Sequence, residues 1–442
     1  MAYTETTTNS YGSRLGKSFG GIGTGFLMFL AGTALLWWNE GRAVKTDKML
    51  NEAQGVTIEM ENINRVDQEF DGKLIHATGL ATTTDSIVDP NFSVGAVAIN
   101  LGHTVEYYQW REHAQQQKKD KLGGGEEVTT TYTYDQGWTN APINSSTFKD
   151  PAYQGKNFVL YQADDARVYA ENVTFGAYKL TSSQIQSISG KSTFDVVFPD
   201  EQLRTWNNEA QRVATQRTGT NAGLGNAVEN SMRSAANAVT NDGQPTNVVD
   251  YPYVHASGGT LYFGASPNSP QVGDVRITFF KTDPATVSLM AVASGDTFKP
   301  FKAKNGKSFS ALVMGEKSAD EMYESEHAAN NMWLWILRIV GIMIVIGGLK
   351  GIFGILTTLM KVIPFLSKVV GAGVGFICTI LGIIWSLIII ALAWLFYRPI
   401  IGIIVLAVAG ALLFFLIKRG RERSAAAAVN TPAPDATPTN NL

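Results

Sequence analysis

The stretch FGGIGTGFLMFLAGTALLWWNEGR, residues 19–42, changes character after residue 38 and determines the fold class of the chain. Its first twenty residues carry no charge. A helix of that length is about 30 Å long, which matches the hydrocarbon core of a bilayer. The competing interpretation is a signal peptide, whose apolar region is only about 7–15 residues long and precedes a cleavage site. Because the run is longer and ends in two tryptophans, which suit a membrane interface, residues 19–38 are predicted to be an uncleaved anchor.

The composition excludes several classes of function. Of the 442 residues only 17% are charged, below the globular norm of about 25%. The net charge of −2 gives no indication of a nucleic-acid partner, and none is expected. With one cysteine, Cys378, the chain has no intrachain disulfide and no zinc site built from several cysteines.

The C-terminal third contains three further apolar runs, residues 332–349, 369–397 and 399–417. Arg398 and Pro399 fit a tight turn between the last two, since proline ends helices and restricts the residue before it. The alternative, one very long buried helix without a cap, is disfavoured. We therefore predict an α+β membrane protein with four transmembrane helices and a large β-rich extracytoplasmic domain, residues 39–331, inserted between the first and second.

Lysines and arginines near the span ends predict the orientation. Nine lie on the side of the termini and five on the opposite side. The nine are Arg14, Lys17, Lys350, Lys361, Lys368, Lys418, Arg419, Arg421 and Arg423, and the five are Arg42, Lys45, Lys48, Lys317 and Arg398. The positive-inside rule then places the tails, residues 1–18 and 418–442, in the cytoplasm, and the large domain in a periplasm or an organelle lumen. The second tail is basic, then Ala/Pro-rich, and predicted to be disordered.

Residues 350–368 are predicted to be an interfacial amphipathic helix. Lys350, Lys361 and Lys368 are 11 and 7 residues apart, so they share one helical face, where they contact anionic headgroups at the cytoplasmic surface. Pro364 is expected to break or kink this helix near its end. The alternatives are a loose connector or an extension of the second span.

Small residues four positions apart allow helix backbones to approach closely, within one chain or between chains. The candidate packing residues are Gly16, Gly20, Gly21, Gly25, Gly371 and Gly375. Arg338 is the one charge well inside a predicted span, and its side chain is expected to extend outward to the interface.

The large domain is predicted to be mostly strands, because its β-branched and aromatic residues cluster in short runs. These runs are residues 73–83, 103–113, 127–138, 272–280 and 286–293. The second and third are expected to form a hairpin with a long polar connection. Residues 200–245 show helical spacing and are predicted to form two amphipathic helices. Ser318 and Glu321 form a capping-box pattern that is expected to start a helix leading into the second span.

No catalytic, cofactor-binding or metal-binding residues are predicted. The five histidines, His76, His103, His113, His255 and His327, show no ligand spacing, and no G-x-S-x-G elbow is present. A triad assembled in space stays open, because sequence order does not exclude it. The chain is nevertheless not expected to be an enzyme.

Four residues mark the predicted junction between spans and domain: Asn39, Glu40, Arg42 and Arg398. One interpretation is a polar collar that satisfies the end of the first helix. The sharper hypothesis pairs Glu40 or Arg42 with a residue near Arg398 or His327, which would couple the domain to the helices.

Several stretches together resemble the transmembrane protein 43 family, also called LUMA. They are NEGRAVKT (39–46), GKLIHATG (72–79), DPNFSVG (89–95), VEYYQWRE (105–112), TYTYDQGW (131–138), INSSTF (143–148), VGDVRITF (272–279) and WLFYRP (394–399). The resemblance runs in order from about residue 15 to 420 and implies four spans with a large domain after the first. It also implies self-association and the organisation of membrane protein complexes. Animal members reside in the endoplasmic reticulum and inner nuclear membrane, with emerin and lamins as partners, and the family has no established catalytic residues.

The Ala/Pro-rich tail suggests a bacterial member, for which emerin and lamins do not apply. The predicted function is a multi-pass, self-associating membrane scaffold that organises other membrane proteins or lipids and has no cofactor. One alternative is a sensor that binds a lipid or small ligand on the large domain. The second is a membrane-bound hydrolase.

Overall fold

The computed structural model describes residues 3–218, 251–360, 364–399 and 403. The chain forms two compact units. The large domain comprises Met1–Tyr11 and Met49–His327, and the helical unit comprises Gly12–Lys48 and Ala328–Leu442. The large domain thus begins at Met49, ten residues after the predicted boundary at Asn39, because the first helix continues beyond the apolar run.

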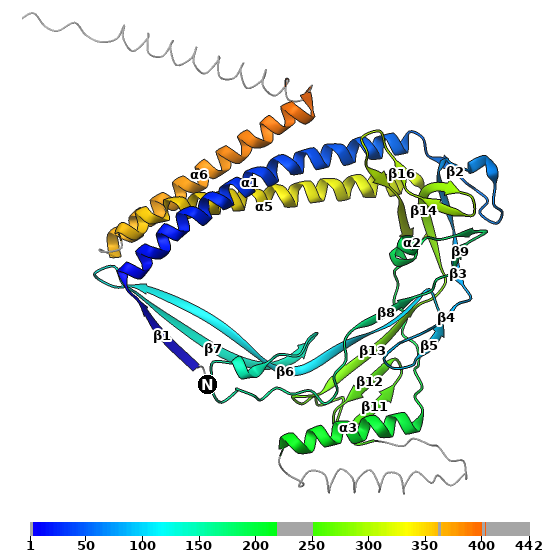
Figure 1. Ribbon diagram of the computed structural model, residues 1–442, viewed down its shortest axis with the longest axis horizontal. Coiled ribbons are helices and arrows are strands. Elements are labelled where there is room, and N and C mark those ends of the chain that lie inside the picture. Colours follow the sequence, from blue (N-terminus) through cyan, green and yellow to red (C-terminus); the bar gives the residue numbers. More distant parts are fainter. Residues whose placement is uncertain (1–2, 219–250, 361–363, 400–402, 404–442) are drawn as a thin grey trace, which may run out of the picture. The chain divides into compact units, whose positions relative to one another are not determined.

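Figure 1 labels most of the helices and strands. The helices are α1 (Tyr11–Gln54), α2 (Ser182–Ser187), α3 (Asp200–Thr218), α5 (Ala319–Leu359) and α6 (Pro364–Tyr397), with short 3-10 turns at Gln68–Phe70 and Ser145–Thr147. The strands are β1 (Tyr3–Asn9), β2 (Ile58–Glu59), β3 (Leu74–Thr83), β4 (Ser86–Val88), β5 (Gly95–Val97), β6 (Asn100–Asp120), β7 (Glu126–Thr139), β8 (Ala166–Tyr169), β9 (Val173–Phe175), β10 (Tyr178–Lys179), β11 (Val254–Ser257), β12 (Thr260–Phe263), β13 (Val275–Thr282), β14 (Ala285–Ser294), β15 (Thr297–Lys299), β16 (Phe301–Lys302), β17 (Ser308–Phe309) and β18 (Ala311–Met314).

The first sheet has the order β1-β7-β6-β13-β12-β11, with β8 also paired to β6. Its longest feature is the β6–β7 hairpin, whose strands pair from Tyr107 with Thr139 out to Asp120 with Glu126 (Figure 1). The predicted long polar connection was wrong, because most of its residues extend the ladder. Only five residues, 121–125, turn the chain, and Gly123 and Gly124 supply the positive φ angles of 84° and 82° that the turn needs.

Strand β1 forms the edge of this sheet beside β7. It pairs antiparallel over seven residues, from Tyr3 with Tyr132 to Asn9 with Glu126. Residues 1–18 were predicted to be a cytoplasmic tail, on the side of the membrane opposite the large domain. Hydrogen-bonded strands lie on one side of a membrane, so this pairing and a single crossing by α1 exclude each other, and the side on which the N-terminus lies stays a prediction. The threonine-rich segment YTETTTN has high β-propensity but few apolar residues, so hydropathy alone does not identify it as a strand.

The second sheet has the order β18-β14-β15-β10-β9-β3-β2, and β14 also pairs with β3. Its buried residues form the main core of the domain, which includes Ile75, Phe175, Tyr178 and Leu289. The five predicted strand runs coincide with β3, β6, β7, β13 and β14, although β6 is longer at both ends. The enrichment of these runs in β-branched and aromatic residues, which suit strands, explains this agreement.

Helix α3 covers the first sheet, and its apolar face carries Trp206 and Ala210, which are 7% and 0% exposed. The edge of Trp206 contacts Phe92, Phe198 and Phe263. The helical segment predicted at residues 200–245 is therefore present in its first half. The second predicted helix lies outside the described residues.

Within the described residues, three helices are long and apolar enough to cross a membrane: Tyr11–Gln54, Ala319–Leu359 and Gly371–Tyr397. They contain the predicted spans 19–38 and 332–349 and most of 369–397. The fourth predicted span, 399–417, falls almost entirely outside the described residues, as does the 418–442 tail. Helix α5 begins at Ala319 with the predicted capping box, in which Ser318 and Glu321 each accept a hydrogen bond from the other's backbone N–H.

The helical residues described within 350–368 belong to two longer helices. Residues 350–359 are the C-terminal part of α5, and Pro364 is the first residue of α6 instead of a break near a helix end. Proline is well tolerated at the first position of a helix, where no N–H is required. Lys361 and the side chain of Lys368 lie outside the described residues. Contact of these lysines with a membrane surface stays a prediction.

Candidate functional site

The helical unit holds a cluster of polar residues where the first apolar run ends. Helix α1 continues for sixteen residues after Trp38, so Asn39, Glu40 and Arg42 occupy interior helical positions. The prediction of a polar collar at a helix end was therefore wrong. Asn39 and Glu40 are 0% and 2% exposed, which shows that they face the neighbouring helices. We call the cluster of Asn39, Glu40, Arg42, Asn330, Arg338 and Trp394 the helix junction.

The central contact of the helix junction is an ion pair between α1 and α5. Arg338 donates from Nε to Oε1 of Glu40 at 2.6 Å and from Nη2 to Oε2 at 2.9 Å. The two side chains are 9% and 3% exposed. This geometry matches the planar fork of a guanidinium to both carboxylate oxygens, the strongest form of this pairing. Arg338 was expected to extend outward to the interface, but it is buried against Glu40.

Helix α6 closes the helix junction with Trp394. Its indole Nε1–H donates to Oε2 of Glu40 at 2.9 Å. The guanidinium of Arg338 lies over the ring of Trp335 at 4.8 Å and near that of Trp394 at 5.6 Å from the centroids. Aromatic faces stabilise a desolvated cation. Three helices therefore meet at one carboxylate–guanidinium pair.

A second layer of amides extends the helix junction along α1 and α5. Asn39 donates to the backbone carbonyl of Leu334 at 3.0 Å, and Asn330 donates to that of Ala43 at 3.0 Å. Arg42 donates to Asn330 Oδ1 at 3.2 Å and to Asn39 Oδ1 at 3.3 Å. These reciprocal bonds fix the register of α1 and α5, because each side-chain amide donates to a backbone carbonyl of the other helix.

Arg398 lies just after α6 and near the C-terminal part of α1. Its guanidinium is 4.0 Å from Asp47, and both side chains are partly exposed at 35% and 40%, so the contact contributes little. A side chain at Gly41 would lie 2.6 Å from the ring of Tyr397. The absence of a Cβ at Gly41 thus lets α6 approach α1 at this level.

Because the Glu40–Arg338 ion pair is buried, removing one partner leaves the other charge buried without a counter-charge. Removing either charge from water costs several kcal/mol of desolvation free energy. The attraction between the two charges offsets this cost only if their remaining hydrogen-bonding groups also have partners. Within the described residues, neither Glu40 nor Arg338 has a buried side-chain nitrogen or oxygen without a partner. The arrangement can therefore hold helices together, and it leaves no free acid or base aimed at a substrate.

The glycines confirm a close approach of α1 and α5 at a different level. A Cβ on Gly25 would lie 2.7 Å from both Gly348 O and Ile352 N, and one on Gly21 would lie 3.7 Å from Gly351 O. Two of the predicted packing residues are thus at a helix contact, but their partners on α5 were not predicted. Of the other four, Gly371 faces a methyl of Thr357, and Gly16, Gly20 and Gly375 have no described atom within 4 Å of a Cβ position.

The prediction that Glu40 or Arg42 pairs with a residue near Arg398 or His327 identified the right region but missed the main partner of Glu40. Arg42 contacts Asn330, three residues after His327, and Glu40 contacts Trp394, four residues before Arg398. The strongest partner, Arg338, lies 298 positions from Glu40 in the chain. A usable signal was present: the lone arginine in an apolar run requires a counter-charge, and Glu40 is the first acid after the first span.

The large domain contains a second buried pair that bears on the hydrolase alternative. His103 Nδ1 lies 2.6 Å from Asp89 Oδ2 and its Nε2 lies 2.9 Å from the carbonyl of Asp164, with both side chains at 0% exposure. Burial by itself raises the pKa of Asp89, but hydrogen bonds from His103 and the Phe92 N–H, together with the charge of His103, outweigh burial and lower it. A dyad sealed from solvent cannot reach a substrate. The described residues also contain no group of three or more His, Cys, Asp or Glu side chains that could hold a metal ion.

Comparisons with known proteins agree with the family resemblance. A family model described as transmembrane protein 43 matches residues 107–399. The human transmembrane protein 43 is 28% identical over 420 residues, which cover 92% of each chain. The mouse protein is 27% identical over 398 residues, 87% of this chain and 86% of its own. The Drosophila melanogaster homolog is 24% identical over 385 residues, 86% of this chain and 89% of its own. No solved structure matches.

Proposed function

The chain belongs to the transmembrane protein 43 family, and from that premise we propose that it is an integral membrane scaffold. In this role it self-associates and organises other membrane proteins or lipids through its large domain. The family members that match are named as transmembrane proteins, and no enzyme family is indicated. The apolar helices α1, α5 and α6 supply the membrane anchor.

The helix junction is the observation that supports a positioning role best. A carrier moves charge or substrate through its helices and needs polar groups that change partners. Here Glu40, Arg338 and Trp394 bind one another, and the amides of Asn39 and Asn330 bind backbone carbonyls. Such a fully paired cluster favours one fixed arrangement of the three helices, as a scaffold requires.

Open small residues support self-association. Gly16 and Gly20 are four positions apart on α1, and no described atom lies within 4 Å of a Cβ on either. Such spacing is typical of close helix–helix contacts in membranes. We assign this face of α1 to a contact with a second copy, which makes a homo-oligomer.

For the orientation, we place the large domain outside the cytoplasm and the basic tail, residues 418–442, inside it. The basic residues from Lys418 to Arg423 support the second placement. The membrane is the bacterial inner membrane if the chain is bacterial, as its Ala/Pro-rich tail suggests, or the endoplasmic reticulum or inner nuclear membrane if it is eukaryotic. Anionic headgroups at the cytoplasmic face are the proposed lipid contact.

The particle mass in lipid nanodiscs, measured by native mass spectrometry, tests the proposal. We expect more than one chain per particle, and we expect Gly16→Leu with Gly20→Leu to shift the population toward one chain. Gly354→Leu is the matched control, because it lies on α5, off this face of α1, and also has no described neighbour within 4 Å. A wild-type particle with a single chain, or equal effects of the control and the pair, contradicts self-association through this face.

A further inference from the structure

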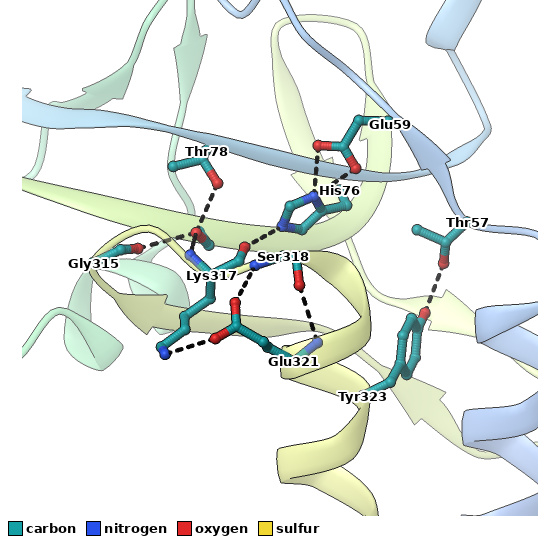
Figure 2. Close-up of polar contacts among 10 residues, drawn as sticks. Thr57, Glu59, His76, Thr78, Gly315, Lys317, Ser318, Glu321 and Tyr323 are labelled. Atoms are coloured by element: carbon teal, nitrogen blue, oxygen red, sulfur yellow. Dashed lines mark hydrogen bonds and ion pairs between the residues drawn. The ribbon is translucent and has the colours of Figure 1, made fainter.

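His76 of β3 connects the second sheet of the large domain to the loop that precedes α5. It lies on β3, paired with Glu59 of β2 on one side and Met290 of β14 on the other. Its side chain is 3% exposed. Figure 2 shows the imidazole between the carboxylate of Glu59 and the backbone of Lys317.

Both ring nitrogens of His76 face oxygen acceptors. Nδ1 lies 2.8 and 2.7 Å from the two carboxylate oxygens of Glu59, and Nε2 lies 2.8 Å from the carbonyl oxygen of Lys317. A neutral imidazole carries one N–H and can donate to only one of these partners, whereas an imidazolium donates to both. The observed geometry is therefore satisfied in full only by the protonated ring.

From this arrangement we propose that His76 is a pH-sensitive latch, which in its protonated form holds the start of α5 on the second sheet of the large domain. The inference concerns regulation and stands independently of the scaffold role.

The loop that His76 holds is the last segment before α5. Ser288 of β14 accepts from the Lys317 N–H at 2.9 Å and donates to the Gly315 carbonyl at 3.0 Å, and Thr78 of β3 contacts the same hydroxyl at 2.7 Å. The capping box then starts α5 at the next residues, Ser318 and Glu321 (Figure 2). Among the described contacts that hold this loop on the sheet, the one from His76 depends on the protonation of a histidine ring.

Glu59 is the counter-ion of His76, because the other charged side chains described near the ring are paired with each other. Glu59 is 57% exposed, so it stays hydrated while it accepts from the ring. On the α5 side, Lys317 donates to Glu321 at 3.0 Å, so these two charges are paired with each other. From β14, Met290 and Ser288 contribute no charge.

The direction of the pH effect follows from these partners. Histidine is the side chain whose charge changes between about pH 5 and 8. As the pH rises and the ring loses a proton, one N–H···O bond becomes a contact between two lone pairs. The contribution of the latch to stability is therefore present while the ring is protonated and lost when it is neutral.

Amide hydrogen exchange of the full-length protein in nanodiscs, followed by mass spectrometry, tests the latch. After correction for the intrinsic rate, we expect protection of residues 315–323 to fall about tenfold between about pH 5 and 8, the loss of one buried hydrogen bond. His76→Gln, which keeps one donor and one acceptor, is expected to show low protection at every pH. Glu59→Gln, at an exposed side chain, is expected to move the transition to lower pH.

His113→Gln is the matched control. His113 also pairs with a carboxylate, Asp135 at 2.8 Å, but it is 60% exposed and lies on β6, away from this loop. We expect it to keep the wild-type transition. A wild-type profile that is flat with pH, or a wild-type transition retained in Glu59→Gln and His76→Gln, overturns the latch. If His76→Gln does not fold, Glu59→Gln alone decides.

Discussion

Glu40 of α1 and Arg338 of α5 share two hydrogen bonds, at 2.6 and 2.9 Å, inside the helical unit, and Trp394 of α6 donates to the same carboxylate. The pair joins residues that lie 298 positions apart in the chain. Because both charges are buried away from water, each is stabilised mainly by the opposite charge and the hydrogen bonds of the other.

Replacing Glu40 with Gln is expected to destabilise the helical unit by about 3–5 kcal/mol, since it leaves the Arg338 charge buried without its counter-charge. Trp394→Phe removes one hydrogen bond to a charged group and is expected to cost about 1.5–3 kcal/mol. Thermal unfolding in nanodiscs, followed by tryptophan fluorescence, measures both. A smaller loss for Glu40→Gln than for Trp394→Phe would contradict the order of these contacts.

The close approach of α1 and α5 predicts that Gly25→Ala destabilises the helical unit. The added methyl would lie 2.7 Å from two backbone atoms of α5, which cannot move aside as a side chain would. Overpacking of this kind costs about 1–3 kcal/mol. Gly23→Ala, which has no described atom within 4 Å, should leave the midpoint of thermal unfolding unchanged or raise it slightly.

The pairing of β1 with β7 predicts a disulfide between Thr6→Cys and Thr129→Cys, which are register partners. The only native cysteine, Cys378, is buried, so it interferes little. A single crossing of the membrane by α1 would put β1 and the large domain on opposite sides. The pairing and such a crossing therefore exclude each other.

The control for this disulfide is Thr6→Cys with Thr133→Cys, since Thr133 pairs with His113 of β6 and has no partner on β1. Oxidation in intact membranes, followed by a mobility shift after reduction, distinguishes the two pairs. The β1 register is refuted if Thr6→Cys forms no disulfide with Thr129→Cys and a membrane-impermeant maleimide labels the two cysteines only from opposite sides.

The buried carboxylate of Asp89 predicts acid sensitivity of the large domain. Its pKa is lowered, because donors from His103 and the backbone outweigh the opposing effect of burial. A lowered folded-state pKa contributes stability above the unfolded value of about 3.9 and loses it as the pH falls. Asp89→Asn is expected to flatten the fall in unfolding temperature between about pH 5 and 3. An equally steep fall in this variant would exclude Asp89 as the source.

Local patterns in the sequence predicted much of the fold. Clusters of β-branched and aromatic residues located β3, β7 and β14, and the capping box located the start of α5. These signals arise from neighbouring residues, so one sequence contains them. The second half of the 200–245 segment and the fourth span fall outside the described residues, and those predictions stay untested.

Long-range pairing was the part that local patterns could not supply. Glu40 and Arg338, and likewise Tyr3 and Tyr132, become neighbours only when distant segments pack. The polar run after Trp38 was interpreted as a helix end, although tertiary contacts with α5 and α6 allow α1 to continue to Gln54. The rule that a buried charge needs a partner would have linked Arg338 to an acid, but not to a particular one.

If the Glu40–Arg338 ion pair sets the arrangement of the three helices, a double-mutant cycle will measure a large coupling between the two residues. The free energy of unfolding is measured for the wild type, Glu40→Gln, Arg338→Gln and the double variant in nanodiscs. We predict a coupling energy of about 3 kcal/mol, so that the double variant is scarcely less stable than either single one. Effects that add to within about 0.5 kcal/mol would contradict the claim.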